Sequence, residues 1–520
     1  MNKRNIVFKP YQFNPQLLIP PSFDELIDKN HPVRVVQKVI SSINIDSLIK
    51  EYQGGGSSSY HPRMLLSAVV YAYLCNTYSS RKIESAIKEN IHYMWLTGMS
   101  TPDHNTINRF RSDRLKNVIK EVFSKVVLLL VEEGLVGIEE IYTDGTKIEA
   151  NANKYTFVWG KAIKTQKEKI AKQLEELWNY TQGIASEELQ DTTKIDFKQI
   201  DSNKVKQVAT QIDQALRGKS VDKEIKKKVE KAKTDFVERM QKYQTQEEIL
   251  GKRNSYSKTD TDATFMRMKE DAMQNGQLKA GYNLQASAAS GEKIFCVNYS
   301  LHQNPADTTT LIPHLKEHQA RYSNFPKVVT ADAGYGSDEN YEFLAENQVE
   351  AYIKYNQFHQ EQKRTPTFKQ GFKSDELFYN EKLDCFYCPM GQPMNFIGTT
   401  IRKTENGYHQ QIKTYRAKNC DGCPLRALCH QSKSNRTIEV NHRLRNHKKK
   451  AKEKLNSEQG IIHRKKRSVT IEPVFAVIKQ NKNFKRFMLR SLPKVNIEAG
   501  LCLLAFNLKQ KAILNSRKAA

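Results

Sequence analysis

Apolar residues in the first part of the chain recur at intervals of three and four, which is the spacing of amphipathic helices. In IPPSFDELIDKNHPVRVVQKVI, Ser22 and Glu25 stand in front of this pattern at the spacing of a capping box. The last helix of the series is expected to open at STPD and to close at Gly134. Residues 1–134 are therefore predicted to form an all-helical unit.

The pattern becomes that of strands in GIEEIYTDGTKIEANANK, where Ile138, Ile141 and Tyr142 lead into Asp144. Two further strands are expected in KAGYNLQASAAS and EKIFCVNYSL, followed by a helix, the strand KVVTADAGYG, a helix and the strand EAYIKYN. This order predicts a mixed α/β fold (α+β), with a meander followed by parallel strands.

Two segments interrupt that fold. The highly charged residues 160–250 have apolar positions at helical spacing, from Val205 to Met240, and are expected to form a helical hairpin or short coiled coil. Residues 359–460 are cysteine-bearing and then strongly basic. The α/β core is thus assigned to 135–159 and 251–358, with a closing helical part at 461–520.

The chain is strongly basic, with 83 Lys and Arg against 57 Asp and Glu, a net charge of +26. Such an excess favours a polyanionic partner, nucleic acid first and an anionic membrane second. The longest apolar run, VVLLLV at 126–131, is far shorter than the roughly 20 residues that span a bilayer. Because the start of the chain has no apolar signal core, we expect a cytoplasmic protein with reduced or metal-bound cysteines.

Two regions are candidates for nucleic-acid contact. SSRKIESAIKENIHYMWLTGMSTPDHNTINRFRSDR predicts a helix, a glycine-containing turn and a second helix, as in a helix-turn-helix, although an ordinary bundle with a solvated basic face has the same pattern. Residues 431–470 hold 13 Lys or Arg against 3 Glu, a local charge of +10. The candidate residues of the two regions are Asn105, Asn108, Arg109, Arg111 and Arg114, and Lys448, Lys449, Lys450, Arg464, Lys465, Lys466 and Arg467.

Three acidic residues stand where an element begins or ends within an apolar stretch: Asp144, Asp332 and Glu472. A charge there is costly unless a cation compensates it, and hard Mg²⁺ prefers oxygen ligands. Two such ions about 3.5 to 4 Å apart serve phosphodiester chemistry. Gly334 and Gly336 are expected to let the backbone bend beside Asp332.

Each of these acids alone is more often a turn former or a helix cap. Other acids compete for the same role, namely Glu149, Asp260, Asp262, Asp307, Asp338 and Glu498.

The cysteines form two CxxC pairs, Cys385 with Cys388 and Cys420 with Cys423, and Cys429 and His430 follow. This spacing favours a structural zinc site, with Cys429 or His430 available to replace one ligand. An iron–sulfur cluster or a degenerate site is the alternative. The remaining cysteines, Cys75, Cys296 and Cys502, lie in apolar stretches and are expected in the core.

TDGTKIEAN, TADAGYGS and IEPVFAVIK resemble the three catalytic motifs of bacterial insertion-sequence DDE transposases. FDELIDKNHPVRVV and YHPRMLLSAVVYAYLCNTYSSRKIESAIKEN resemble the helical leader of the same enzymes, so the resemblance covers nearly the whole chain. It implies an RNase H-like catalytic core in which Asp144, Asp332 and Glu472 bind two Mg²⁺ ions, with Mn²⁺ as a substitute.

The resemblance also implies a role for Lys479, which lies seven residues after Glu472 as in many relatives and would hold a DNA phosphate from the same helix face. A lysine on the helix surface is the simpler reading. The place four before Glu472, where relatives often have Arg, holds Ser468, and Arg467 stands one place earlier. Lys465 stands in the place of a usual Tyr.

The function implied is double-stranded DNA cleavage at terminal inverted repeats and joining to target DNA, by a homodimer or larger assembly associated with the nucleoid. An RNase H-like nuclease that does not join ends, and an inactive DNA-binding derivative, remain alternatives.

Overall fold

The computed structural model describes residues 22–52, 58–185, 195–197, 200–268, 276–362, 372–404 and 406–519. The chain divides into two compact units, one of residues up to Leu115 together with those from Asn507 onward, and one of residues Lys116–Phe506. The sequence had suggested a boundary at 134. The helix α8 (Ile119–Glu132) instead belongs to the second unit, where Phe123 packs against Tyr299 of the sheet.

The first unit is helical throughout its described residues, as predicted. Ser22 and Glu25 form the expected capping box at the start of α1. Gly98 ends α6 in the left-handed conformation with φ 54°, which provides the glycine-containing turn before α7. The helices are α1 (Phe23–Leu26), α2 (Pro32–Ser42), α3 (Asp46–Lys50), α4 (Pro62–Leu74), α5 (Ser80–Glu89), α6 (Ile91–Thr97), α7 (His104–Arg109) and the π-helical turn η1 (Phe110–Arg114).

A six-stranded mixed sheet forms the centre of the second unit, with the order β4-β5-β1-β7-β8 and β6 also paired to β5. β5 is antiparallel to β1, β4 and β6, whereas β1, β7 and β8 run parallel. The predicted meander followed by parallel strands is confirmed. The strands are β1 (Glu140–Glu149), β4 (Thr264–Arg267), β5 (Leu278–Ser290), β6 (Ile294–His302), β7 (Val328–Ala331) and β8 (Glu350–Ile353).

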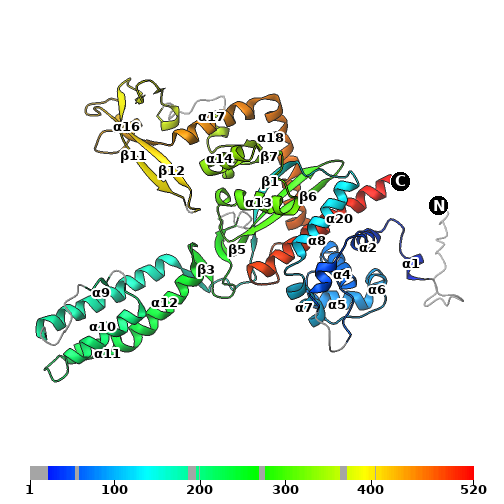
Figure 1. Cartoon of the computed structure of the whole chain (residues 1–520), viewed down its shortest axis with the longest axis horizontal. Helices are drawn as coiled ribbons and strands as arrows, with labels where there is room; N and C mark the ends of the chain where they lie inside the picture. The colour runs from blue at the N-terminus through cyan, green and yellow to red at the C-terminus, as the bar shows by residue number, and fades with distance from the viewer. Residues whose placement is uncertain are drawn as a thin grey trace, which may run out of the picture. The chain divides into compact units, whose positions relative to one another are not determined.

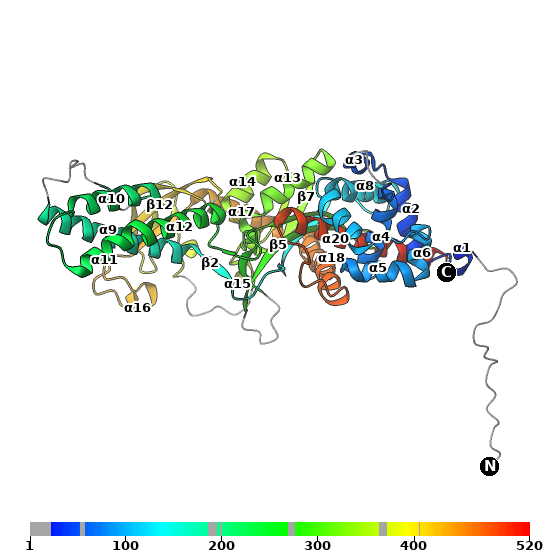
Figure 2. The same ribbon diagram turned by 90° about the horizontal axis from the view of Figure 1, so that it is seen from below.

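Helices cover both faces of this sheet; Figure 2 shows α13 (Leu311–Tyr322) and α14 (Asp338–Glu346) above it and α18 (Glu458–Thr470) below it. Successive side chains of β1 point to opposite faces of the sheet. On one face Thr143 reaches Ser287, whose hydroxyl meets His314 of α13 at 2.7 Å. On the other face the Tyr142 hydroxyl lies 3.2 Å from His463 of α18. Asp144 has the parity of Tyr142 and therefore faces α18.

The helical insertion at residues 160–250 has the expected helical character, but its described residues form more helices than a single hairpin has (Figure 1). It leaves the core at the antiparallel pair β2 (Phe157–Trp159) and β3 (Ser255–Ser257). Its own apolar core is built from the predicted helical positions, among them Val205, Ile212 and Phe236. The helices are α9 (Gly160–Ile184), α10 (Ser202–Ala215), α11 (Lys223–Lys231), the π-helical turn η3 (Ala232–Phe236) and α12 (Val237–Leu250).

The cysteine-bearing insertion contains a second, antiparallel sheet with the order β13-β12-β11-β10-β9. Its strands are β9 (Tyr379–Asn380), β10 (Cys385–Tyr387), β11 (Pro393–Lys403), β12 (His409–Ala417) and β13 (Thr437–Val440). The remaining helices and short turns among the described residues are η4 (Asp307–Thr309), η5 (Ala333–Tyr335), α15 (Phe358–Glu361), η6 (Ser374–Glu376), α16 (Arg426–Cys429), α17 (His442–Asn456), α19 (Glu472–Ala476), η7 (Val477–Asn481) and α20 (Leu492–Ala519). Among the described helices, none combines the length and the apolarity needed to cross a bilayer.

The separate core of the helical insertion predicts local unfolding. Replacing buried Phe236 by Ala should destabilise the insertion by about 3–5 kcal/mol because the cavity is not refilled. Hydrogen–deuterium exchange should then rise in α9–α12 and stay unchanged in β1 and β5. Tyr155→Ala, at a side chain that is 88% exposed, is the control. Exchange that rises equally in the central sheet would contradict an independent core.

Candidate active site

The three candidate carboxylates are brought to one region by the central sheet. Asp144 lies within β1, Asp332 directly follows β7, and Glu472 begins α19. β1 and β7 pair in parallel as far as Tyr142 and Thr330, so two more residues in the same register place Asp332 beside Asp144. Asp332 accepts a hydrogen bond from the Gly334 amide at 2.8 Å, which fixes its carboxylate at the strand end.

Arg467 joins Asp144 to Glu472. Its Nη1 lies 3.2 Å from Oδ2 of Asp144 and its Nη2 lies 3.1 Å from Oε1 of Glu472. The Arg467 and Asp144 side chains are only 12% and 15% exposed, whereas Glu472 is 54% exposed. One guanidinium thus compensates two carboxylates that would otherwise repel each other across the gap between β1 and α19.

The helix that carries Arg467 is interrupted before it reaches Glu472. α18 ends at Thr470 and α19 begins at Glu472, with Ile471 between them. The basic run at 431–470 predicts Arg467 as a DNA-binding residue, and Arg467 stands five rather than four residues before Glu472. Its position between the two carboxylates was not foreseen.

Lys354 is a second cation near the site that the sequence analysis missed. Lys354 directly follows β8, as Asp332 directly follows β7. Because the carboxyl ends of parallel strands share one edge of a sheet, this position in the sequence could have indicated that Lys354 lies near Asp332. Burial lowers the pKa of Lys354, and the charges of Arg467 and Arg464 lower it further, whereas Asp332 and Glu472 oppose the shift. The lysine therefore shares its electrostatic environment with two of the candidate acids.

The glycines after Asp332 are needed for close approach rather than for unusual dihedral angles. Gly336 has an ordinary φ of −75°. A Cβ atom at this position would lie 2.5 Å from the carbonyl oxygen of Lys354. The turn therefore packs its backbone directly against the residues that follow β8.

Lys479 does not continue the regular α-helix of Glu472. Residues Val477–Asn481 form the π-helical turn η7, whose wider turn changes which residues share a face. The Lys479 side chain is 7% exposed. Its predicted contact with a DNA phosphate stays a prediction.

The helix-turn-helix candidates separate into two groups. Asn105, Asn108 and Arg109 are exposed on α7. Arg111 is buried, and its guanidinium donates to the Tyr78 carbonyl oxygen and to the Tyr73 hydroxyl. Arg114 donates to the Glu51 carbonyl oxygen and lies over the Tyr52 ring. The two inner arginines stabilise the helical unit, which leaves the exposed three as the residues able to meet a partner.

The basic candidates of the second region lie on α17 and α18. Lys449, Lys450 and Lys465 are exposed, and no ion pair reaches them from the described residues. Lys448 pairs with Asp375 at 2.7 Å, Lys466 lies 3.6 Å from Glu140, and Arg464 stacks over Phe358.

Four of the five candidate cysteines, together with His430, line one small cavity: Cys388, Cys420, Cys423 and Cys429. Cys385 lies in β10 outside that lining. Arg436 donates from Nη1 to Sγ of Cys429 at 2.8 Å. Both ring nitrogens of His430 are buried without a hydrogen-bond partner among the described residues.

The cysteine sulfurs are not drawn together as a metal cluster. Across the described ranges, no three of these thiol and imidazole groups have their ligand atoms within 4.8 Å of one another. Of the other cysteines, Cys296 and Cys502 are buried as expected, whereas Cys75 is exposed.

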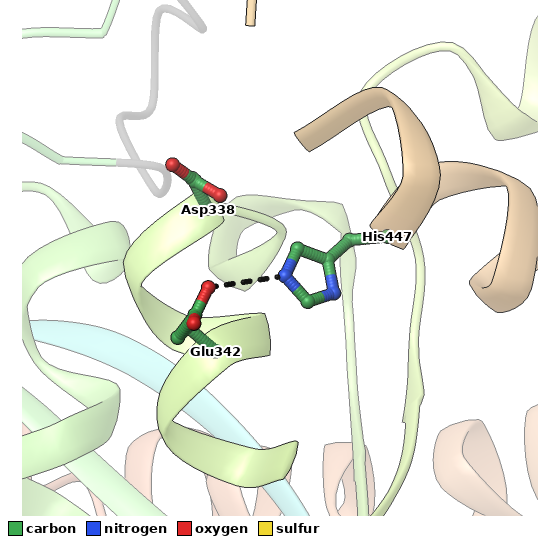
Figure 3. Close-up of side chains that lie close together, drawn as sticks. All are labelled: Asp338, Glu342 and His447. Carbon is green, nitrogen blue, oxygen red and sulfur yellow. Dashed lines mark hydrogen bonds and ion pairs between the residues drawn. The ribbon is translucent and has the colours of Figure 1, made fainter. Parts of the chain in front are cut away.

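A different trio does meet that distance: ligand atoms of Asp338, Glu342 and His447 lie within 4.8 Å of one another (Figure 3). Asp338 is fully buried, yet Arg443 already pairs with it at 3.1 Å and with Glu342 at 3.2 Å. Asn441 donates to the same Asp338 carboxylate at 2.8 Å. The trio could hold a cation, but its charge is balanced by an arginine that joins α14 to α17.

Most of the competing acids also have structural partners. Asp260, Asp262 and Glu498 accept backbone N–H groups between Met488 and Leu492. Glu149 pairs with Lys279 at 3.2 Å. Asp307 oxygens are among the nearest atoms that a Cβ at Gly145 or at Gly334 would meet.

Two family models match the chain. A transposase DDE domain matches residues 387–512, which include Glu472 but neither Asp144 nor Asp332. A transposase domain (DUF772) matches residues 21–113, most of the helical first unit. No curated protein matches the chain. Both matches are to transposase models, which confirms the resemblance to insertion-sequence DDE transposases.

The close packing at Gly336 gives a test of the site's architecture. Gly336→Ala should lower the free energy of unfolding by about 1–3 kcal/mol, because the new methyl group meets the Lys354 carbonyl oxygen. Gly137→Ala is the matched control, since a Cβ there has nothing within 4 Å, and should change stability by less than about 0.5 kcal/mol. Denaturant unfolding measures both; equal effects would contradict the close approach.

Proposed function

We propose that this chain is an insertion-sequence transposase whose second unit is an RNase H-like catalytic domain with Asp144, Asp332 and Glu472 as its carboxylate triad. The observation that carries the proposal is the convergence of the three elements that bear these acids, with Arg467 bonded to two of them. The strand order, in which a meander is followed by parallel strands, supports it.

The carboxylates suit divalent magnesium, for which Mn²⁺ would substitute. Asp144, Asp332 and Glu472 would hold the ions, and hard oxygen ligands are what Mg²⁺ selects. The position between Asp144 and Glu472 already attracts a cationic group, the Arg467 guanidinium. When bound, two such ions activate an attacking oxygen and stabilise the leaving oxygen of a phosphodiester.

The chain's own cations would bind and orient DNA at this edge of the sheet. Lys354 and Arg467 lie near the acids and offer donors to phosphate oxygens. The residues of the site would hold the reacting phosphodiester in line with its nucleophile. The nucleophile would be water in the cleavage step and the 3′-hydroxyl of the cut end in the joining step. Positioning and charge compensation, rather than a covalent protein intermediate, would supply the catalysis.

Two exposed surfaces would bind double-stranded DNA. Asn105, Asn108 and Arg109 on α7 would read a terminal inverted repeat, and the exposed lysines of α17 and α18 would contact phosphates of donor or target DNA. Such phosphate contacts should weaken steeply with salt. Joining two ends requires both in one complex, so a homodimer or larger assembly on DNA, within the nucleoid, completes the proposal.

The cysteine cavity would hold structural zinc. The cavity offers the thiolates that zinc prefers, those of Cys388, Cys420, Cys423 and Cys429. His430 lines the same cavity, and its ring nitrogens, which have no hydrogen-bond partner among the described residues, offer a further donor. Cys385, the other cysteine of the first CxxC pair, lies in β10 outside the lining of this cavity.

The alternative function is a metal-dependent nuclease that cuts but does not join ends, or an inactive DNA-binding derivative. An assay with pre-cut repeat ends and a target plasmid separates them, since only a transposase yields joined product.

Removing one carboxylate at a time tests the triad. Asp144→Asn, Asp332→Asn and Glu472→Gln should each lower DNA cleavage by about 10²-fold or more, because the charge that holds the ions is lost, and should leave DNA binding intact. Cleavage and gel-shift assays measure the two effects, with Asp262→Asn, at an acid that accepts the Leu492 N–H, as the control. Full activity of Asp332→Asn would refute the assignment.

Metal analysis tests the zinc site. The purified chain should contain about one zinc ion, and Cys423→Ser should lose it, because a structural site needs its full set of ligands. Cys75→Ser, at an exposed cysteine of the other unit, should retain it. Neither zinc nor iron in the wild-type chain would dismiss the site.

A further inference from the structure

The backbone segments that carry Asp144 and Asp332 rest against one further acid, Asp307. A Cβ atom at Gly145 would lie 2.7 Å from Oδ1 of Asp307. A Cβ atom at Gly334 would lie 3.0 Å from Oδ1 of Asp332 and 3.7 Å from Oδ2 of Asp307. These two carboxylates therefore approach the same point, and Asp307 contacts the residue that directly follows Asp144.

Asp307 is fixed in this place by two buried amides of β5. Asn283 Nδ2 donates to its Oδ1 at 2.7 Å and Gln285 Nε2 donates to the same oxygen at 2.9 Å. Gln285 lies directly opposite Gly145 in the β1–β5 register and is fully buried. Its Oε1 in turn accepts the hydroxyl of Tyr335, which is also fully buried.

Capping does not explain this aspartate. Asp307 begins η4, just before α13, where an Asp often accepts a backbone N–H through its side chain. Here the Thr310 N–H bonds to the backbone carbonyl of Asp307 instead, and its side chain turns to the β5 amides. Among the described residues no hydrogen bond reaches its Oδ2.

The charge of Asp307 acts on the same buried group as the charges of the two triad aspartates. Burial raises the pKa of the Tyr335 hydroxyl well above its usual value, and the charges of Asp307, Asp144 and Asp332 raise it further. The charges of the three acids therefore act on one and the same buried hydroxyl. Each added negative charge in such a place increases the attraction for a cation.

We propose that Asp307 is a positioning residue of the carboxylate site, which supports the backbone at Gly145 and Gly334 and adds a fourth negative charge that strengthens binding of divalent cations. The inference rests on the proposed function, because it assigns Asp307 to the site of Asp144, Asp332 and Glu472. Its amide partners Asn283 and Gln285 hold the charge in place from the sheet.

Titration of the full chain with Mn²⁺ alone, read by electron paramagnetic resonance of the free ion, tests the proposal. Asp307→Asn keeps an oxygen to accept from Asn283 and Gln285 but removes the charge, so the Mn²⁺ affinity should fall about tenfold or more. Asp307→Glu keeps the charge and should lose less. Glu346→Gln, at an exposed acid at the end of α14, is the control for net charge and should bind as the wild type does.

Thermal unfolding with and without Mn²⁺ provides a second readout, because an ion bound only by the folded chain raises Tm. The rise in Tm should shrink in Asp307→Asn whatever its stability without metal.

Wild-type Mn²⁺ affinity in Asp307→Asn, together with loss of binding in Asp144→Asn, would overturn the role of Asp307 and leave the proposed function standing. Wild-type affinity in Asp144→Asn would instead remove the carboxylate site itself, and the inference with it.

Discussion

The backbone pairing of β1 is the constraint on which the candidate site depends. One edge of β1 pairs with β5 and the other with β7, and the β7 pairing stops two residues before Asp144. That early stop leaves room for Asp332 beside Asp144, while β5 places Gln285 opposite Gly145. Because a slip of one residue would turn every side chain to the other face, the register decides whether Asp144 and Asp332 can meet.

Charge compensation is the second requirement, since carboxylates gathered close together repel each other. Arg467 meets two of them at 3.1 and 3.2 Å. An arginine also compensates a buried carboxylate elsewhere in the second unit, where Arg443 pairs with Asp338. The protein thus uses guanidinium groups to hold acids in place, and Glu472 is exposed to solvent although it is paired with Arg467.

The order of elements and the sheet topology could be predicted because they depend on periodicity and on local chain signals such as the capping box at Ser22. Contacts between distant residues could not. The π-helical turn that contains Lys479 leaves no signature in spacing, and the burial of Arg111 depends on Tyr73 and Tyr78, more than thirty residues earlier. The selection of Asp307 from six competing acids likewise required the β1–β5 register.

The closure of the helical insertion at its base has a consequence for the order of folding. Asp144 and Asp332 are far apart along the chain, and parallel pairing over so long a separation costs loop-closure entropy and slows folding. The β2–β3 pair joins Phe157 to Ser257, and the residues between them bury a core of their own. Once that segment has folded, the two ends of the insertion are held together at the β2–β3 pair. The loop that must then close when β1 pairs with β5 is shorter than the number of residues between the two strands.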